Sequence, residues 1–175
     1  VFRDQILANA ALGNGNTDPR ENMYFLEYDN PGGGVRHVMN KYQGEETTPN
    51  SYEFTDDIKI YRYSDAILMH AEIQNALDNT ADAVTDLNLI RNRVGIGDYA
   101  GGMTKQDVDD AILLERGVEF AFEGKRWHDL VRTETVEAAN ANHPFAKIPT
   151  KNDYLMPIPA DERLINPNLT QNSGY

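Results

Sequence analysis

The chain contains no cysteine among its 175 residues. Disulfides, thiolate catalysis and zinc sites built on cysteine are therefore all excluded. The redox compartment stays undecided, because a chain without cysteine is stable in both oxidising and reducing compartments. The sequence also lacks an initiator methionine and a signal peptide, and it begins at Val1. We therefore expect a processed or excised piece whose targeting signal lies outside this chain.

Positive charge is also scarce. The 16 Lys and Arg residues against 28 Asp and Glu give a formal net charge of −12. Nucleic acids and anionic lipid surfaces both require a basic protein surface, so we expect no nucleic-acid partner. No apolar run approaches the roughly 20 residues that a membrane span needs. With 40% apolar and 25% charged residues, the composition is that of an ordinary globular domain with a real core.

Patterns for catalysis or metal binding are weak. His70 and Glu72 have the spacing of zinc deaminases, but the cysteine ligands of that class are absent. Asn14, Asn16 and Asp18 begin like a calcium-binding loop, yet the later positions of the EF-hand pattern do not match. We favour a solvated loop there, and a looser calcium site stays open. The sequence predicts no catalytic residue, no metal and no cofactor.

Residues 1–57 form a loop-rich segment in which Asn, Gly, Asp and Tyr are frequent. Residues 1–12 are compatible with a short helix. Residues 23–28 and 35–42 read as two short strands joined by a turn at 30–34, which is one short β-hairpin. The stretches at 13–22 and 43–57 read as polar loops by their turn chemistry.

Residues 58–175 form a second, helical region. Apolar residues follow two adjacent stripes of a first helix, which predicts that this helix is largely buried. A second helix begins at Asn79 or Thr80 and ends at Gly95, and its short connection predicts antiparallel packing on the first. The stripes of the first helix are Ile60, Tyr63, Ile67, Ala71 and Ala66, Met69, Ile73, Leu77; that of the second is Ala83, Leu87, Ile90, Val94.

A third helix is predicted from residue 105 towards residue 132, with Thr104 and Asp107 as a capping box. Its apolar stripe contains Gly117 and Gly124, and glycines on an apolar face let another backbone come close. We therefore expect a tight packing face with Trp127 in the core. Gly124 is also where the helix could kink or break.

Glu115, Glu119 and Glu123 recur every fourth residue of this predicted helix, where like charges repel by roughly 0.2–0.5 kcal/mol per pair. Positively charged side chains must therefore compensate the charge of these three glutamates. The expected partners are Arg116 for Glu119, Arg126 for Glu123, and Arg91 and Arg93 from the preceding helix. The alternative, a glycosidase acid pair, is disfavoured because two carboxylates on one helix do not flank a substrate. We favour a structural charge network between packed helices.

The aromatic residues of the first third are the best ligand candidates. Flat rings beside amide groups suit sugars, which present apolar CH faces and hydroxyl edges. For each single tyrosine, pinning a loop onto the helices is the competing interpretation. The candidate glycan contacts are Tyr24, Tyr28, Tyr42, Tyr52 and Asn50.

The fold class that follows is mainly α, with tetratricopeptide-like (TPR-like) helical hairpins, an irregular loop-rich segment and one short β-hairpin. The hairpin starts lie too far apart for a strict 34-residue tetratricopeptide period, and a degenerate repeat stays open. The end of the chain, from residue 143, is interrupted by prolines and cannot form one helix. We expect it to lie as a strap across the helices.

Four segments, in order, resemble the C-terminal part of the SusD/RagB family of outer-membrane glycan-binding lipoproteins, over residues 61–175. They are YRYSDAILMHAEIQNAL, DLNLIRNRVGI, LLERGVEFAFEGKRWHDLVR and LMPIPADERLINPNLTQNSGY. The residues that match the structural signature are Arg62, Glu72, Arg91, Arg93, Glu115, Arg116, Glu119, Glu123, Gly124, Arg126, Trp127 and Asp129.

The resemblance implies a cell-surface glycan receptor that does no chemistry. Such proteins deliver sugars for polysaccharide (starch-type) utilisation to a SusC-like TonB-dependent transporter, on which they act as a lid. It also implies a lipid anchor on an N-terminal part of the same protein that precedes Val1, and Tyr175 at or near the natural C-terminus. No signature residue receives a sugar contact by this resemblance. A TPR-like protein-interaction module is the alternative, and a glycoside hydrolase ranks last.

Overall fold

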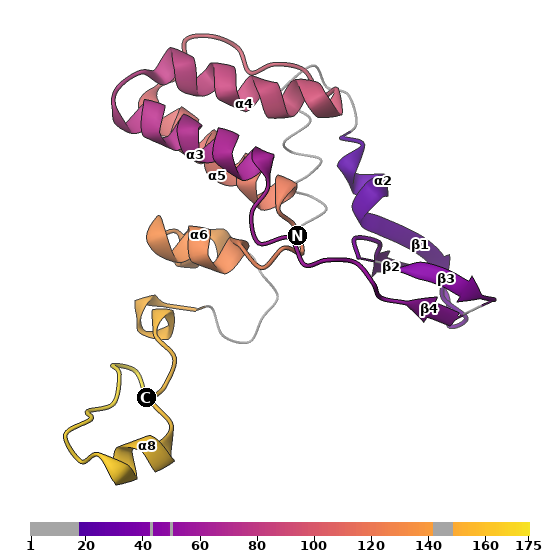
Figure 1. Cartoon of the computed structure of the whole chain (residues 1–175). Coiled ribbons are helices and arrows are strands. Elements are labelled where there is room, and N and C mark those ends of the chain that lie inside the picture. The colour runs from indigo at the N-terminus through magenta and orange to yellow at the C-terminus, as the bar shows by residue number, and fades with distance from the viewer. Residues whose placement is uncertain (1–17, 43, 50, 142–148) are drawn as a thin grey trace. The chain divides into compact units, whose positions relative to one another are not determined.

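The computed structural model describes residues 18–42, 44–49, 51–141 and 149–175. Two compact units divide the chain, Val1–Arg126 and Trp127–Tyr175, and each is described by itself. Helices outweigh strands, so the predicted mainly α class is confirmed (Figure 1). The sequence-based division at residue 57 stays a prediction. The first unit contains α2 (Arg20–Tyr24), β1 (Phe25–Asp29), β2 (Val35–Met39), β3 (Glu45–Thr48), β4 (Ser51–Glu53), α3 (Tyr63–Ala76), α4 (Thr80–Val94) and α5 (Lys105–Glu119).

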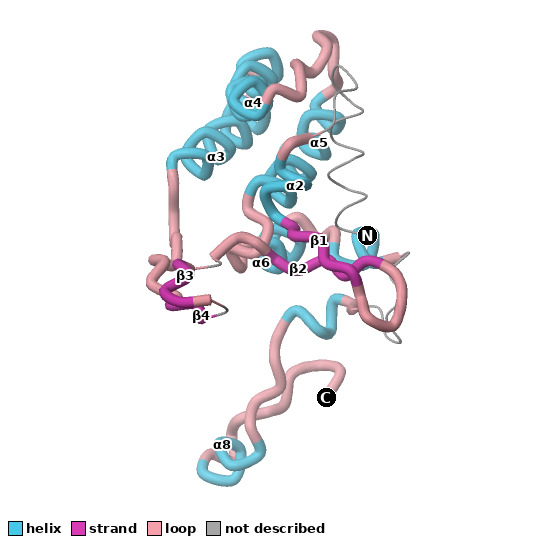
Figure 2. Tube along the Cα trace, turned by 90° about the vertical axis from the view of Figure 1, so that its right-hand side faces the viewer, coloured by secondary structure: helices cyan, strands magenta, loops and turns pink. Residues whose placement is uncertain are grey.

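Helices α3 and α4 form the predicted hairpin, and they lie side by side in both views (Figures 1 and 2). Helix α4 ends where expected. Gly95 adopts the left-handed conformation with a φ of 75°, and its N–H donates to the carbonyl oxygen of Arg91. Ala83, Leu87 and Ile90 of the predicted stripe are buried. Asn79 is the N-cap residue of α4, but its side chain makes no capping hydrogen bond.

Helix α3 does not bury the stripes that its periodicity suggested. Leu68 and Ala71 are fully buried, but Ile73 and Leu77 are 56% and 65% exposed. The helix turns polar residues inward instead, because each has a partner there. Asn75, for example, donates to the carbonyl oxygen of Lys105 (2.9 Å) and to Asp109 (2.6 Å). The prediction of a largely buried apolar helix was therefore wrong for most of both stripes.

The predicted third helix is two helices. The capping box is present, since the N–H of Asp107 donates to the hydroxyl of Thr104 and the Asp107 carboxylate accepts from the N–H of Thr104. Helix α5 then ends at Glu119, and α6 (Arg126–Arg132) begins only after a turn. Gly124 lies in that turn with a φ of 74°, so the break expected at this glycine is confirmed. One continuous stripe to residue 131 was wrong.

The first segment holds two antiparallel hairpins where one was predicted. Strands β1 and β2 pair from Phe25 opposite Met39 to Asp29 opposite Val35, which confirms the expected hairpin. Strands β3 and β4 pair in the stretch that was read as a polar loop. All the described residues of these two strands are exposed, so no apolar alternation marks them in the sequence. Helix α2 likewise replaces part of a predicted loop.

The main core lies between α3, α4 and α5, and a smaller cluster of Tyr24, Val118 and Ala121 joins α2 to the end of α5. Burial of this kind provides roughly 25 cal/mol per Å² of apolar surface. The main cluster consists of Leu68, Ala71, Ala83, Leu87, Ile90, Tyr99, Val108, Ala111, Ile112 and Phe120.

The second unit contains α6, α7 (Val136–Asn140), η1 (Lys151–Tyr154) and α8 (Ala160–Ile165). The prediction that the proline-rich end does not form one helix is thus confirmed for its described residues. The side chain of Gln171 donates to the carbonyl oxygen of Ile158 (3.0 Å) and accepts from its N–H (2.8 Å), which ties the last turn to residue 158. The strap across the helices stays a prediction. None of the helices in the described ranges is long and apolar enough to cross a membrane.

Candidate ligand-binding site

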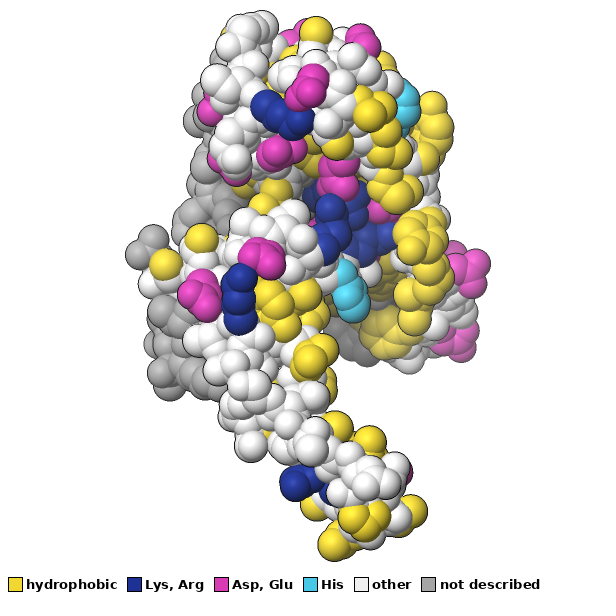
Figure 3. Space-filling view, turned by 90° about the vertical axis from the view of Figure 1, so that its left-hand side faces the viewer, with side chains coloured by type: hydrophobic (Ala, Val, Ile, Leu, Met, Phe, Trp, Pro, Cys, Tyr) yellow, Lys and Arg dark blue, Asp and Glu magenta, His cyan; other side chains and the backbone are white. Residues whose placement is uncertain are grey.

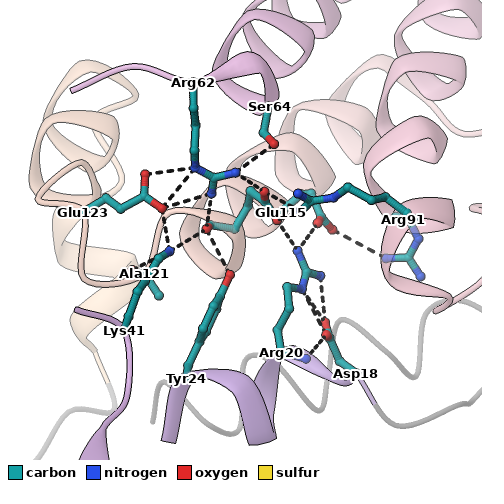
Figure 4. Close-up of polar contacts among 12 residues, drawn as sticks. Asp18, Arg20, Tyr24, Lys41, Arg62, Ser64, Arg91, Glu115, Ala121 and Glu123 are labelled. Atoms are coloured by element: carbon teal, nitrogen blue, oxygen red, sulfur yellow. Dashed lines mark hydrogen bonds and ion pairs between the residues drawn. The ribbon is translucent and has the colours of Figure 1, made fainter. Parts of the chain in front are cut away.

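The three glutamates meet at the end of α5. Glu115 and Glu119 lie one turn apart on its inner face, and Glu123 follows in the turn after the helix. All three side chains are fully buried. A buried carboxylate is costly unless cations and hydrogen bonds compensate it, so the surrounding charges decide what this site can do. Figure 4 shows how those charges converge.

Glu115 is paired with Arg20 and Arg91. The Nη1 atom of Arg20 donates to Oε1 of Glu115 at 2.6 Å, and Nη1 of Arg91 lies 3.8 Å from its Oε2. Arg20 is itself only 2% exposed, and its Nη2 pairs with Asp18 at 2.7 Å. Asp18 also accepts from the backbone N–H of Arg20. This buried chain of charges fastens α2 to α5.

Glu119 is the most heavily bonded acid. Arg93 donates through Nη2 to both of its carboxylate oxygens (2.6 and 2.7 Å), Arg20 donates to Oε2 (3.0 Å), and Arg62 donates to Oε1. Burial alone would raise its pKa, but hydrogen bonding to Arg62 and the charges of all three arginines lower the pKa of Glu119 to about 2. This carboxylate is therefore ionised throughout the physiological range.

Glu123 is held by Arg62 and Lys41. The guanidinium of Arg62 donates through Nε to both oxygens (3.1 Å each), and the ammonium of Lys41 donates to Oε1. These bonds lower the pKa of Glu123 against the opposing effect of its burial. Burial also lowers the pKa of Lys41, although its bond to Glu123 opposes that shift.

The prediction that Arg91 and Arg93 answer the glutamates is confirmed, and the two partners expected within the helix were wrong. The side chain of Arg116 points towards α3, where its Nη2 lies 3.7 Å from Oδ1 of Asp65 and its Nε lies 3.7 Å from Oε1 of Glu72. The Nη1 atom of Arg126 donates to the carbonyl oxygen of Leu113 (2.9 Å). Glu123 and Arg126 do not share one continuous helix, because α5 ends at Glu119 and α6 begins at Arg126. Arg116 and Glu119 do share α5, but each is paired with a side chain from another helix.

Gly117 does permit a close approach, but by a side chain. A Cβ atom at this position would lie 2.8 Å from Nη1 of Arg126. The expectation that Trp127 lies in the core was wrong, since it is 40% exposed. Its ring contacts Tyr154 edge to face, with centroids 6.3 Å apart. Asp129 is buried, and it accepts from Arg132 at 2.9 Å.

Arg20 and Lys41 are the residues of this cluster that sequence reasoning missed. Arg20 comes from a stretch that was read as a polar loop and Lys41 from the end of a predicted strand, and nothing local marks either residue as a partner of α5. The available signal was indirect: three acids at four-residue spacing required more cations than the neighbouring helix could supply. Their contacts with the end of α5 span 95 residues for Arg20–Glu115 and 82 for Lys41–Glu123.

A cavity of about 550 Å³ opens beside this cluster. Its volume falls within the roughly 300–1,000 Å³ that is typical of small-molecule sites. The wall combines α2, the residues after β2, the segment before α3 and the ends of α4 and α5. The lining residues are Pro19, Arg20, Met23, Tyr24, Lys41, Tyr42, Asp56, Lys59, Arg62, Arg93, Val94, Glu119 and Glu123.

Two of the four candidate tyrosines belong to this lining. Tyr24 is 7% exposed, and its hydroxyl donates to the carbonyl oxygen of Glu119 at 3.1 Å. Tyr42 has a φ of 67°, which is uncommon for a bulky residue, and its buried hydroxyl has no hydrogen-bond partner among the described residues. Such strain is often found at functional sites. Tyr28 and Tyr52 lie outside the cavity on β1 and β4, and Asn50 falls outside the described residues.

Metal-binding groups do not gather in the part of the chain that the structure describes, where no cluster of three His, Cys, Asp or Glu residues could hold an ion. Of the loop considered for calcium, Asn14 and Asn16 lie outside the described residues. The carboxylate of Asp18 is bonded by Nε and Nη2 of Arg20.

The SusD family model matches residues 25–175, so the chain belongs to the SusD/RagB family. Two SusD-like proteins of Formosa agariphila are similar in sequence. Protein P2 is 29% identical over 164 residues, covering 86% of this chain and 32% of its own length. Protein P38 is 31% identical over 145 residues, covering 78% and 28%.

Solved structures share the fold. A SusD superfamily protein from Bacteroides vulgatus matches 99% of this chain and 43% of its own, with a TM-score of 0.73 and 23% identity. A SusD superfamily protein from Parabacteroides distasonis matches 98% of this chain and 41% of its own, with a TM-score of 0.68 and 23% identity. The chain thus spans about a third of the length of the similar Formosa proteins.

Proposed function

We propose that this chain is part of a non-catalytic cell-surface protein that binds oligosaccharides or polysaccharides and delivers them to a SusC-like TonB-dependent transporter in the outer membrane. The observation that carries the proposal is the SusD family match over residues 25–175. In this proposal a lipid anchor on a more N-terminal part of the same protein holds it at the cell surface.

Exposed aromatic rings on the two hairpins support sugar binding. Tyr28 on β1 is 51% exposed and Tyr52 on β4 is 40% exposed. An exposed ring offers a flat apolar face to the CH groups of a sugar, and its hydroxyl can bond at the edge. Hairpins that present such rings on a helical framework form a surface that can follow a long polymer.

The state of the buried acids argues against glycoside hydrolysis at this cluster. Hydrolysis needs one carboxylic acid that is protonated near neutral pH. The pKa of Glu119 lies at about 2, and its neighbour Glu115 is bonded to Arg20. Neither is placed to give a proton to a leaving group. We therefore propose binding without chemistry.

A second candidate is a protein-interaction module of the tetratricopeptide type. It is favoured by the exposed apolar side chains of Met69 and Ile73 on α3 and of Leu77, the C-cap residue of this helix. Figure 3 shows that hydrophobic side chains are present on one face of the molecule. Unpartnered apolar surface of this kind commonly marks an interaction site.

Affinity electrophoresis tests the proposal. The purified protein is run through gels that contain starch, xylan, polygalacturonate or carrageenan, and retardation reports binding. We expect saturable retardation by at least one polymer, weakened by Tyr28→Ala or Tyr52→Ala and unchanged by Lys151→Gln. Retardation by none of these polymers, together with saturable binding to a peptide library, would favour the second candidate. Co-purification with a SusC-type transporter tests the delivery step separately.

A further inference from the structure

The carboxylates of the cavity wall beside α5 are already occupied. Both oxygens of Glu119 accept bonds from arginines, and both oxygens of Glu123 accept from Arg62. The ammonium of Lys41 donates to the carboxylate of Glu123 and to the backbone carbonyl oxygens of residues 119 and 121. A ligand in the cavity would therefore find these groups saturated and would depend on what remains.

What remains in the described lining is mostly hydrogen-bond donors. Among the described residues, the ammonium of Lys59 has one hydrogen-bond partner, the carbonyl oxygen of Asp57 (3.2 Å). Arg93 is 53% exposed and bonds Glu119 through Nη2 alone, which leaves its Nε and Nη1 without a partner among the described residues. The hydroxyl of Tyr42 is buried and has no hydrogen-bond partner in the part of the chain that the structure describes.

The charge of the wall also differs from that of the chain. Five of the lining side chains are cationic and three are carboxylates, whereas the whole chain carries a formal charge of −12. One carboxylate of the three, Asp56, accepts from the backbone N–H of Gly44 at 3.0 Å. The wall thus carries more cations than carboxylates on an acidic protein, although Arg20 is also paired with Asp18 and Glu115 behind the wall. An excess of cations attracts anions.

We propose that this cavity binds an acidic sugar unit, one that carries a carboxylate or a sulfate group. Lys59 and Arg93 contact the anionic group, and the hydroxyl of Tyr42 donates to an oxygen of the same unit. The inference rests on the proposed glycan-binding function and narrows its ligand class to anionic polysaccharides.

An anion explains the wall better than a neutral sugar does. Neutral sugar hydroxyls both donate and accept, so a site for them usually offers carboxylates and amides as well as donors. Here the two buried carboxylates, Glu119 and Glu123, are engaged, and no described residue forms an ion pair with Lys59. A lysine that only balanced the buried glutamates would contact one of them, as Lys41 does.

Matched polymer pairs test the inference, with the purified protein and calorimetric titration as the readout. The pairs are polygalacturonate with its carboxyl-reduced form, and κ-carrageenan with its desulfated form. Starch and xylan serve as neutral probes. We expect one acidic polymer to bind at least tenfold more tightly than its neutralised counterpart, and the successful pair separates carboxylate from sulfate. Binding should weaken as salt rises, because exposed charges are screened.

Variants locate the site. Lys59→Gln is expected to weaken acidic binding about tenfold, as the loss of a charge-assisted contact does. Tyr42→Phe removes only a hydroxyl that has no partner among the described residues, and it is expected to weaken acidic binding about threefold. Lys105→Gln, which removes an exposed lysine of α5 outside the cavity, is the control and should change nothing.

The outcomes separate the two proposals. Equal binding of both members of each pair, or acidic binding that Lys59→Gln leaves intact, overturns the acidic-sugar inference and leaves the glycan receptor standing. Binding of starch or xylan alone does the same. Binding of none of the six polymers counts against both the inference and the proposed function.

Discussion

Arg62 reaches from the residue before α3 to the last residue of α5, where its guanidinium donates both to Oε1 and to the backbone carbonyl oxygen of Glu119. The backbone bond satisfies one of the carbonyl groups that every helix leaves open at its C-terminal end. The side-chain bond compensates a buried charge. One arginine therefore fixes the start of one helix to the end of another.

Replacing Arg62 is expected to be costly. Arg62→Met leaves Glu119 and Glu123 with fewer cations in a buried site, and we expect the free energy of unfolding to fall by about 2–4 kcal/mol. Urea denaturation at pH 7, followed by circular dichroism, measures this. Arg132→Gln is the control, because Arg132 is 43% exposed and pairs within α6. A loss as small as that of the control would show that the cluster adds little stability.

Acid should weaken the fold through Glu119. Its pKa is about 2 in the folded chain against an ordinary value of 4.5, so its contribution is complete above about pH 4.5 and disappears as the pH falls towards 2. The shift corresponds to about 3 kcal/mol. Unfolding measured from pH 7 to pH 2.5 should show this decline.

The variant Glu119→Gln isolates that contribution. We expect it to be less stable at pH 7 and to show a shallower decline below pH 5. Glu45→Gln, on the exposed strand β3, should keep the slope of the original chain. An unchanged slope in Glu119→Gln would contradict the assignment.

Gly124 is expected to resist substitution. Its φ of 74° suits glycine, and no atom within 4 Å would obstruct a Cβ, so the cost of Gly124→Ala is purely conformational. We expect a loss of about 1 kcal/mol in the free energy of unfolding. Gly101→Ala provides the match, since that residue also has open space but no left-handed φ. Thermal or urea unfolding of the pair should place Gly101→Ala near the original chain or slightly above it.

The inward face of α3 can be tested with two leucines. Leu68 is fully buried and Leu77 is 65% exposed. Leu68→Ala should therefore cost about 2–4 kcal/mol in the free energy of unfolding. Leu77→Ala should stay within about 0.5 kcal/mol. Equal losses in the two variants would mean that the helix buries a different face from the one described.

Much of the helical hairpin could be predicted from the sequence, because its signals are local. The end of α4 at Gly95 and the capping box of α5 each depend on residues within one turn of the chain. The face that α3 buries could not be predicted this way. Ser64 and Asn75 point inward because Arg62 and Asp109 meet them there, and periodicity alone carries no record of such partners.

The sequence analysis had identified Tyr24 and Tyr42 of the cavity as ligand candidates, but the charge cluster was predictable only for the glutamates of α5 and their partners on α4. Three acids at regular spacing indicated that cations must lie close to them. Arg93 was predicted as a partner because it lies in the adjacent helix. Arg20 and Lys41 approach from distant segments with no pattern of their own. Strands β3 and β4 were missed for a related reason, since exposed polar strands lack the alternation that identifies a half-buried one.

The long separations within the charge cluster have a consequence for how the chain folds. Arg20 and Glu115 are 95 residues apart, and Arg62 and Glu119 are 57 apart. Contacts between distant residues form only after a large loop closes, whereas the α3–α4 hairpin needs only its short connection. We therefore expect the helical hairpin to order early and the charge cluster to lock in last. Kinetic φ-values near zero for Arg20→Ala, beside higher ones for Leu87→Ala, would be the signature of this order.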